Sequence, residues 1–493
     1  MLAVLLSAGG ANAAKVACGQ SHTCAIRDDG NVWCWGSNGS GQLGMGASGG
    51  SSPNPVPLDL GSGRTAKALC AGRQHSCVIL DDDTIKCWGN GGSGKLGYGD
   101  TTTKNAPPAT PVDLGAGRTA KAVSCGSAHT CAILDDDSLK CWGYGSNGQL
   151  GIGNYGIISS PTAVVATYLG AGVKSVAAGQ YHTCAVLNDG SMKCWGHGGL
   201  ASLGYGDTSI RSSPPAQNVN LGAGLITAKS VSATVLNGHT CVILNDDTLK
   251  CYGYNGYAQL GYGDTTQRTV PDASVIDLGS GKTAKSVSTG DGVSTGTESS
   301  SKAGFTCAVL NDGSLKCFGS NSKGQLGTGS YLPPAGNLPA TADLGTGRTA
   351  TDISLGSEHA CAALDDGTIK CWGQNNNGQV GTGSPGGYGV TLPTLVSFDG
   401  SSSSGSSGSS PGGSGPGGPP GPPGPSGSSS GSSGSGNVTY VYLAGPPGPA
   451  GPPGPGYLGP GSNSTLDDDD GAMSHANTLA IVALSTFVYF LML

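Results

Sequence analysis

The 493-residue chain has few charged and few aromatic side chains, which make up 11% and 5% of its residues. The charged share is less than half of the roughly 25% that is usual in soluble proteins. Its 24 Lys and Arg against 31 Asp and Glu give a formal net charge of −7. A nucleic-acid-binding surface needs clustered cations, so this composition argues against nucleic acid as a partner.

Helical periodicity is missing as well. No run of ten residues repeats apolar side chains at the spacing of a helix face. Gly occupies 90 positions, more than double its usual share, and Gly-rich sequence forms poor helices. Such a chain can fold only if many tight turns join short strands. We therefore expect an all-β fold.

A repeat dominates the sequence, and it is clearest between residues 124 and 153. Its skeleton is Gly-x-x-His-Thr-Cys, a short apolar run, an acidic turn, then Lys-Cys-Trp-Gly and Gly-Gln-Leu-Gly. Two cysteines ten positions apart mark each copy, and copies follow one another every 53 to 66 residues. The seven pairs are Cys24 and Cys34, Cys77 and Cys87, Cys131 and Cys141, Cys184 and Cys194, Cys241 and Cys251, Cys307 and Cys317, and Cys361 and Cys371. A period this constant indicates a repeat architecture.

Each copy is predicted to form a β-hairpin, because β-branched and apolar runs flank its acidic turn. Centring the turn of the third copy on Asp136 pairs Cys131 with Cys141. The third residue of a three-residue loop favours a left-handed backbone, which Gly supplies and Asp tolerates. The residues at that place are Gly30, Asp83, Asp137, Gly190, Asp247, Gly313 and Gly367.

Counting outward from each turn puts the paired cysteines at a non-hydrogen-bonded position, where two side chains come closest. We therefore expect seven disulfides within the hairpins, each worth roughly 2–3 kcal/mol. Disulfides persist in oxidising compartments, which favours an extracellular protein.

Three further cysteines, Cys18, Cys70 and Cys125, are placed at one shared repeat position just before the Gly-x-x-His element. The total of 17 cysteines is odd, so at least one thiol is free or bonds another chain. A zinc site of His129, Cys131, Cys141 and Cys125 is an alternative, but later copies lack the fourth cysteine. We expect no metal and no cofactor, and a structural hydrogen bond in a tight turn for the repeat histidines.

A strand before each His element and another after Gly-Gln-Leu-Gly, as at residues 110–114, give four strands per copy. Seven such units over residues 15–398 predict a seven-bladed β-propeller. Gly-x-x-His-Thr, Asp-Gly, Trp-Gly-x-Asn and Gly-Gln-Leu-Gly together resemble the regulator of chromosome condensation repeat, whose fold is this propeller. The cysteine-rich version is similar to secreted or surface members, one of which is a bacterial β-lactamase inhibitor. The resemblance transfers structural positions only: His22, His75, His129, His182, His239, His359 and the Trp142-Gly143 pair.

Antiparallel topology separates two faces of this propeller. The acidic hairpin turns share one face with linkers such as Asp59-Leu-Gly-Ser-Gly-Arg-Thr-Ala. Turn chemistry and charge balance explain these carboxylates, with a ring of calcium sites as the alternative. The loops that differ between copies lie on the opposite face, at residues 154–160, 197–202, 291–302 and 331–337. Variable loops on a rigid scaffold are where partners usually bind.

The two ends of the chain predict secretion and anchoring. Residues 1–14 read as a signal peptide with an Ala11-Asn12-Ala13 cleavage pattern, and its short apolar core is consistent with a truncated gene sequence. Residues 399–471 form a Ser/Gly/Pro-rich, partly collagen-like stalk, and 472–493 end in an apolar tail. That tail fits a glycosylphosphatidylinositol signal with attachment at Asp470 or Gly471, or alternatively a tail anchor. Exposed glycosylation sequons are expected at Asn38, Asn437 and Asn463.

The sequence shows no catalytic constellation, so a non-enzymatic role is expected. The leading hypothesis is a cell-surface propeller that binds a protein or glycan through variable loops on one face. The alternative, which rests on the family resemblance, is a nucleotide exchange factor for a Ran-like GTPase. It would require an intracellular location, which the cysteine pattern does not favour.

Overall fold

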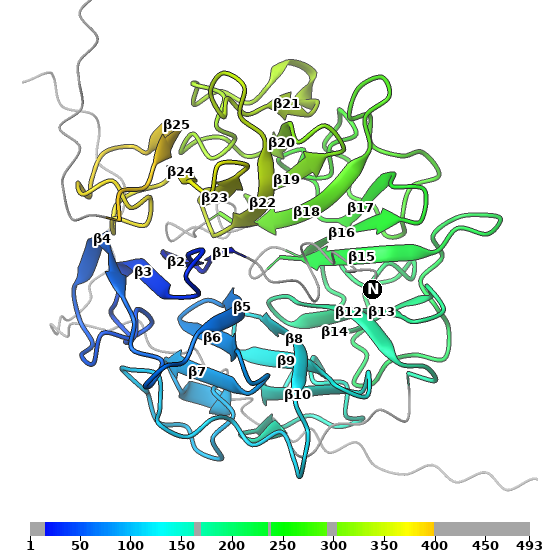
Figure 1. The fold of residues 1–493 in the computed structure, drawn as a ribbon. Coiled ribbons are helices and arrows are strands. Elements are labelled where there is room, and N and C mark those ends of the chain that lie inside the picture. Colours follow the sequence, from blue (N-terminus) through cyan, green and yellow to red (C-terminus); the bar gives the residue numbers. More distant parts are fainter. Residues whose placement is uncertain (1–14, 162–168, 235–237, 293–302, 399–493) are drawn as a thin grey trace, which may run out of the picture. The chain divides into compact units, whose positions relative to one another are not determined.

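The structure is a computed structural model that describes residues 15–161, 169–234, 238–292 and 303–398. These residues form seven antiparallel sheets arranged around a common centre, which confirms the seven-bladed propeller (Figure 1). Two 3-10 turns, η1 (Gly92–Gly94) and η5 (Ala335–Asn337), are the helical elements that we describe. No helix in the described ranges is long and apolar enough to cross a membrane.

Each blade takes its strands from one continuous stretch of chain, starting at the centre and moving outward. The first strands are β1 (Val16–Cys18), β5 (Ala66–Ala71), β8 (Ala120–Cys125), β12 (Val173–Ala178), β15 (Ala228–Ala233), β18 (Ala284–Gly290) and β22 (Ala350–Leu355). The second strands are β2 (His22–Ile26), β6 (His75–Leu80), β9 (His129–Leu134), β13 (His182–Leu187), β16 (His239–Leu244), β19 (Phe305–Leu310) and β23 (His359–Leu364). The third strands are β3 (Val32–Ser37), β7 (Ile85–Gly89), β10 (Leu139–Tyr144), β14 (Met192–Gly196), β17 (Leu249–Gly253), β20 (Leu315–Gly319) and β24 (Ile369–Gly373).

The outer edge is less regular than the sequence predicts. Four blades have a fourth strand: β4 (Ser51–Pro57), β11 (Ile157–Ile158), β21 (Ala340–Thr341) and β25 (Val390–Leu395). In blades two, four and five the fourth strand shrinks to single bridges, such as Gly89 with Lys104. Residues 110–114, predicted as an outer strand, form none, although the Val112 N–H still bonds to the Ile85 carbonyl at 2.8 Å. The variable stretch 154–160 contains β11, so part of it is sheet edge.

The hairpins form in the predicted register. Cys131 lies opposite Cys141, and the other six pairs are matched in the same way. All seven third loop residues have positive φ, from 64° at Asp137 to 80° at Gly190. The seven cysteine pairs are joined as disulfides with Cα–Cα distances of 4.0–4.1 Å. That short spacing is the one expected at non-hydrogen-bonded positions, so each blade carries one internal disulfide.

The hydrophobic core lies between the blades, where one face of each sheet packs on the next. Trp88 of blade two, for example, packs with Val32 and Leu43 of blade one and with Leu60 of the linker between them. Similar clusters fill the other contacts between neighbouring blades, which we call seams. Because each seam needs the linker leucine that crosses it, the chain connection is itself part of the core.

The closing seam, between blade seven and blade one, is built differently. No strand is exchanged, and β1 packs beside β22 (Figure 1). A cluster that includes Val16, Trp35, Val380 and Val396 fills the gap. Two main-chain groups of blade one bond across it: Lys15 N–H to Asp352 Oδ2 at 3.0 Å, and Cys18 N–H to Ser354 Oγ at 2.9 Å. Side chains therefore close the ring.

The three extra cysteines do not share one repeat position, so that prediction is wrong. Cys18 and Cys125 lie opposite Thr23 and Thr130, whereas Cys70 lies opposite Cys77, one residue earlier in the repeat. Because side chains alternate along a strand, Cys70 faces the next blade while Cys125 faces the previous one. The two form a disulfide between blades two and three, with a Cα–Cα distance of 5.5 Å. Cys18 is buried and free.

Replacing Ser354 by cysteine should create a second disulfide between blades, with Cys18 as the partner. Ser354 lies opposite Cys361 in blade seven, just as Cys70 lies opposite Cys77 in blade two, so Ser354 and Cys70 share a repeat position. Cys18 has the same repeat position as Cys125. The bond would join residues separated by 336 positions, and loops that long gain up to about 4–5 kcal/mol in the chain-entropy account. We expect the protein to lose its one free thiol and to melt at a higher temperature.

The matched control is Ser288→Cys, at the same repeat position but facing Leu355. It should add a free thiol and give no gain in melting temperature. Two free thiols in the Ser354→Cys protein would contradict this register of the closing seam.

Candidate functional site

The repeat histidines connect neighbouring blades. Six of them place Nε2 at 2.9–3.1 Å from a Ser or Thr hydroxyl at the start of the next blade's second strand. The pairs are His22 and Ser76, His75 and Thr130, His129 and Thr183, His182 and Thr240, His239 and Thr306, and His359 and Thr23. The predicted bond is structural, but it joins two blades and does not stay within one turn.

Each hydroxyl also donates to a main-chain carbonyl of the preceding blade. Thr183 Oγ1, for example, donates to the Gln149 carbonyl at 2.8 Å, and the same carbonyl accepts from Trp195 Nε1 at 3.0 Å. Because the hydroxyl hydrogen is used in this way, the His129 Nε2 must carry the proton in its own bond to Thr183. We call this set, from histidine through hydroxyl and carbonyl to Trp, the inter-blade latch.

The latch is altered between blades six and seven at both of its ends. Phe305 replaces the histidine and Ala360 replaces the Thr, and both are fully buried in one apolar cluster. Trp372 Nε1 still donates to the Gln325 carbonyl at 2.8 Å. A buried imidazole N–H without an acceptor would be costly. Because both residues are replaced together, no such group is left.

Burial also keeps the latch histidines neutral. Loss of solvent lowers the pKa of His22, His129, His239 and His359 to about 3 and that of His182 to about 4. The pKa of His75 is lowered well below its ordinary value for the same reason. These histidines therefore stabilise the fold as uncharged donors and do not act as acid–base groups.

Hydrogen-bond coupling in the latch can be measured with His129 and Thr183. The single change Thr183→Ala leaves a buried N–H unpaired and should cost about 1–3 kcal/mol of unfolding free energy. The double change His129→Phe with Thr183→Ala copies the Phe305 and Ala360 pair. We expect it to cost about 1 kcal/mol less than the sum of the two single changes in urea unfolding. As a control, His129→Phe combined with Ser76→Ala affects two different latches, so their costs in unfolding free energy should add. An equal coupling free energy in the two double-mutant cycles would rule out a specific bond between His129 and Thr183.

The latch also predicts acid sensitivity. The unfolded chain binds protons at histidine near pH 6.5, whereas the folded chain resists them down to about pH 3–4, so stability falls as pH drops below 6.5. Asp352 partly offsets this loss of stability. Burial raises the pKa of its carboxyl to about 6, so here the folded chain binds a proton at a higher pH than the unfolded chain does. We expect the melting temperature to fall between pH 7.5 and 5, with a shallower slope in the His129→Phe, Thr183→Ala protein. An identical slope in both proteins would contradict this account.

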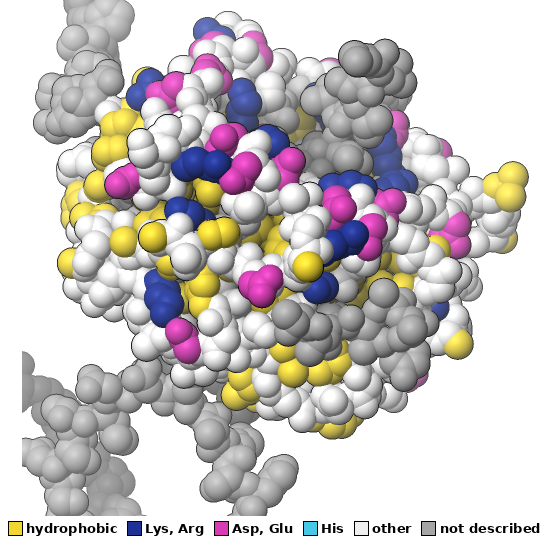
Figure 2. Space-filling model, turned by 60° about the horizontal axis from the view of Figure 1, so that its bottom comes forward, with side chains coloured by type: hydrophobic (Ala, Val, Ile, Leu, Met, Phe, Trp, Pro, Cys, Tyr) yellow, Lys and Arg dark blue, Asp and Glu magenta, His cyan; other side chains and the backbone are white. Residues whose placement is uncertain are grey.

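The face formed by the hairpin turns and linkers, here called the turn face, carries charges of both signs side by side (Figure 2). Arg64 pairs with Asp81 and Asp82, and Arg118 and Arg348 repeat this pattern in blades three and seven. The central Asp of each turn also accepts hydrogen bonds two residues on, and those from Ser191 hold the pKa of Asp189 below its ordinary value. These carboxylates are thus engaged by hydrogen bonds within the turns and by neighbouring cations.

The opposite face, here called the loop face, carries the turns before the second strands and the loops after the third strands. In blades four and five these segments carry several aromatic and apolar side chains. The Tyr181 ring lies 6.2 Å from the His197 ring, edge to face. The Leu200 side chain lies against Gly238, whose carbonyl accepts from the Tyr254 N–H at 3.2 Å. We call Tyr181, His197, Leu200, Tyr254 and Tyr257 the aromatic arc.

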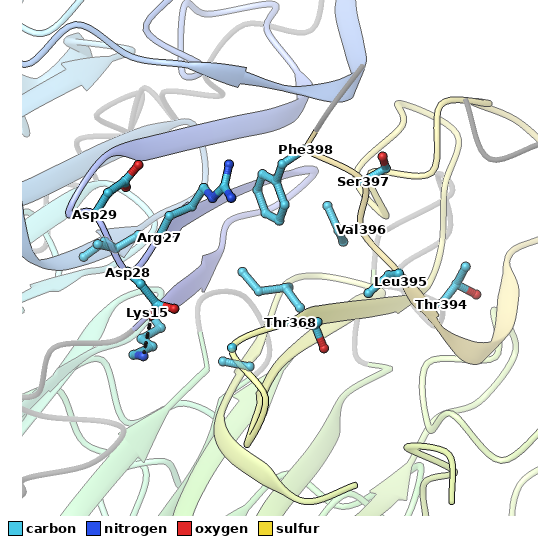
Figure 3. Close-up of a pocket in the computed structure, with 14 residues that line it drawn as sticks. Lys15, Arg27, Asp28, Asp29, Thr368, Thr394, Leu395, Val396, Ser397 and Phe398 are labelled. Atoms are coloured by element: carbon cyan, nitrogen blue, oxygen red, sulfur yellow. Dashed lines mark hydrogen bonds and ion pairs between the residues drawn. The ribbon is translucent and has the colours of Figure 1, made fainter. Parts of the chain in front are cut away.

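A pocket of about 580 Å³ opens on the turn face at the closing seam (Figure 3). Its floor is apolar and includes Ile26, Ile369 and Val396, while Lys15, Asp28 and Asp29 lie at its edge. Arg27 extends toward Phe398, with its guanidinium carbon 5.1 Å from the ring centroid (Figure 3). The six other blades have a buried leucine where blade one has Arg27: Leu80, Leu134, Leu187, Leu244, Leu310 and Leu364.

The structure revises one further prediction about sites and rules out the zinc ligand set that was the alternative. Asn38 is 4% exposed, and its amide braces the following loop through the Ala47 carbonyl and the Leu43 N–H, so it is not an exposed glycosylation acceptor. All three cysteines of the zinc alternative, Cys125, Cys131 and Cys141, are in disulfides and offer no thiolate. Asn437, Asn463, Asp470 and Gly471 lie outside the described residues.

Sequence comparison agrees with this architecture. The RCC1-like domain matches residues 4–296, and the regulator of chromosome condensation (RCC1) repeat matches 300–325 and 350–379. The chain belongs to the RCC1-like family. It is 28% identical over 392 residues to the ultraviolet-B receptor UVR8 of Arabidopsis thaliana, covering 78% of this chain and 83% of the receptor. It is 26% identical over 375 residues to the human E3 ubiquitin-protein ligase HERC2, covering 76% of this chain but only 7% of the ligase.

Two solved structures show the same fold. Human WBSCR16 superposes with a TM-score of 0.59 at 22% identity, covering 70% of this chain and 86% of that one. Prp20p of Saccharomyces cerevisiae gives a TM-score of 0.61 at 18% identity, covering 77% and 86%. At these identities the likeness concerns the fold alone.

Proposed function

We propose that this RCC1-like propeller works outside the cell or on its surface, as a non-enzymatic module that binds a protein or glycan. The observation that carries the location is the cysteine chemistry. Eight disulfides take up 16 of the 17 cysteines, and the remaining thiol of Cys18 is buried. Reducing compartments do not maintain such a set.

The aromatic arc is the part of the loop face best suited to a partner. Tyr181 and Tyr257 are 37% and 36% exposed, so they offer ring surface while their bodies stay packed. Rigid, half-exposed aromatic side chains give large contact area at a small entropic cost, which is why they are enriched where proteins bind. The arc belongs to blades four and five, whereas the corresponding loops of blades two, six and seven begin with Asn90, Ser320 and Gln374.

Anchoring of the propeller is part of the same proposal. The Ser/Gly/Pro-rich stretch from residue 399 would act as a stalk, and the apolar end with Asp470 or Gly471 as the lipid-attachment signal. Such a stalk would keep the propeller clear of the membrane surface.

Cells that produce the full chain provide the test. We expect the protein to be labelled by an impermeant reagent on intact cells and to be released by phosphatidylinositol-specific phospholipase C. Its intact mass should show at most one reactive thiol after denaturation without reductant. Sixteen or more free thiols in protein isolated from its native cells would contradict the extracellular location.

Binding is measured on the same cells by chemical cross-linking of the displayed protein. The Tyr181→Ala, Tyr257→Ala protein should lose the cross-linked species. Tyr388→Ala, at an 83% exposed tyrosine near the outer edge of blade seven, serves as matched control and should keep them. Equal cross-linking by both variants would show that the arc is not the binding surface.

A second candidate function is nucleotide exchange on a Ran-like GTPase. It is favoured by the structural likeness to Prp20p, whose structure was described together with its binding to Gsp1p and histones. Purified full chain that accelerates nucleotide release from Ran would establish it.

A further inference from the structure

The free thiol of the propeller lies against a disulfide of the neighbouring blade. Cys18 ends β1, is 4% exposed, and packs in the closing seam in the same apolar cluster as Cys361 and Cys371 of blade seven. The Sγ atoms of Cys18 and Cys361 and a ring nitrogen of His359 all lie within 4.8 Å of one another. That separation is close to van der Waals contact between sulfur atoms, so a small movement brings the thiol onto the disulfide.

One hydroxyl group lies between the two sulfurs. Thr23 Oγ1 is 3.9 Å from Cys18 Sγ and 3.9 Å from Cys361 Sγ. The same hydroxyl belongs to the inter-blade latch, because His359 Nε2 lies 2.9 Å from it and it donates to the Gln379 carbonyl at 2.9 Å. The latch therefore fixes blade one against blade seven at the point where the sulfurs meet.

The same meeting of sulfurs occurs at the seam between blades two and three. Cys125 and Cys77 have the repeat positions of Cys18 and Cys361, and the Sγ atoms of Cys70, Cys77 and Cys125 lie within 4.8 Å of one another. There Cys125 is bonded to Cys70, so no thiol is left. At the closing seam a serine replaces Cys70, and the thiol remains beside the bonded sulfur.

The other blades carry no sulfur at this repeat position. The residues that take the place of Cys18 in blades two, four, five, six and seven are Ala71, Ala178, Ala233, Thr289 and Leu355. The closing seam is therefore the one seam, among the residues that the structure describes, where a thiol at this position faces an intact hairpin disulfide.

We propose that Cys18 exchanges with the Cys361–Cys371 disulfide within the closed seam and so gives the propeller a second covalent state. The Cys18 thiol first loses its proton to a base in the solvent. Its thiolate attacks Cys361 Sγ, and the bond from Cys361 to Cys371 breaks as the bond from Cys18 to Cys361 forms. Cys371 leaves as a thiolate and takes a proton from water. The numbers of thiols and disulfides are the same before and after, so the step needs no oxidant or reductant.

Burial of the thiol controls the rate of this exchange. Loss of solvent raises the pKa of Cys18 to about 12, so only a small fraction of the thiol is ionised at neutral pH. Asp352 faces the thiol from β22 and is already charged at pH 8, because its pKa is about 6. His359 faces it from β23 and is neutral, because burial lowers its pKa to about 3. Above pH 8 the Cys18 thiol is therefore the group among these that changes its charge.

The exchange moves a covalent bond from a hairpin of blade seven to the seam between blades seven and one. A bond from Cys18 to Cys361 would add to the latch and the apolar contacts that close the ring. The inference goes beyond the proposed function and does not rest on it, because the step involves no partner.

Disulfide mapping of the full chain tests the exchange. The native protein is held at pH 8 or pH 9, and samples are then acidified and digested with pepsin, since exchange stops where thiolates are absent. A peptide pair linked through Cys18 and Cys361 should appear, together with unpaired Cys371. Its rate of formation should rise about tenfold from pH 8 to pH 9, because the ionised fraction of a thiol far below its pKa rises tenfold per pH unit.

Two results would overturn the proposal. One is a free thiol that is still found only at Cys18 after about a week at pH 9. The other is a rate that rises only about threefold from pH 8 to pH 9, as expected for a solvated thiol with a pKa of about 8.5. That result would show that Cys18 reacts only after the seam has opened.

Two variants locate the reacting thiol. Cys18→Ser removes it, so neither the linked peptide nor a free Cys371 should appear at either pH. Adding Ala178→Cys to Cys18→Ser places a thiol at the same repeat position of blade four, in the apolar cluster that contains Cys131 and Cys141. That protein should link the introduced cysteine to Cys131 and free Cys141. Free Cys371 in the Cys18→Ser protein would contradict the proposed attack by Cys18.

Discussion

The buried bond between a histidine of one blade and a hydroxyl of the next is the constraint on which the propeller depends. It joins sheets that share no strand, and it places Nε2, a hydroxyl, a carbonyl and in most seams a Trp N–H within a few ångströms. A buried donor without an acceptor costs more than the bond gains, so each member of the latch holds the others in place. The repeat therefore keeps His and Thr together, or loses both, as at Phe305 and Ala360.

Disulfides and latches stabilise different levels of the structure. A disulfide such as Cys131–Cys141 closes a ten-residue separation inside one hairpin, and its buried sulfurs pack in the seam without bonding to the next blade. The latches and the apolar seams provide the contact between blades, and Cys70–Cys125 adds a covalent bond to one seam only. Loops on either face can vary in length because neither system uses their outer residues. This division leaves the loops of the loop face free to differ from blade to blade.

The sequence predicts the hairpin of each repeat, but not the outer edge of the blade, where residues 110–114 form no strand. The turn residues and the spacing of the cysteines are enough to derive the hairpin register, because a three-residue loop allows one alignment only. Contacts between copies were harder to predict, since they depend on which side of a strand faces which neighbouring blade. Cys70 shows this: its one-residue offset from Cys125, counted from the following His, was visible in the sequence and implies opposite sides of two neighbouring strands. The latch partners carried a similar signal, because copy six lacks its His and copy seven its Thr. Arg27 stood out in the alignment against six leucines, but the pocket beside it depends on how blades one and seven meet, which no residue pattern records.

Phe398 determines where a pull on the stretch that follows it would reach the propeller. Its ring packs edge-on against Trp33 and Trp35, with centroids 5.8 and 5.9 Å apart, and it is the last described residue before the Ser/Gly/Pro-rich stretch. Tension applied along that stretch reaches the ring through this aromatic contact, at the junction of blades seven and one. The force would first separate the Phe398 ring from blade one and then peel β25 from β24. The Cys361–Cys371 bond would stop further extension into that hairpin.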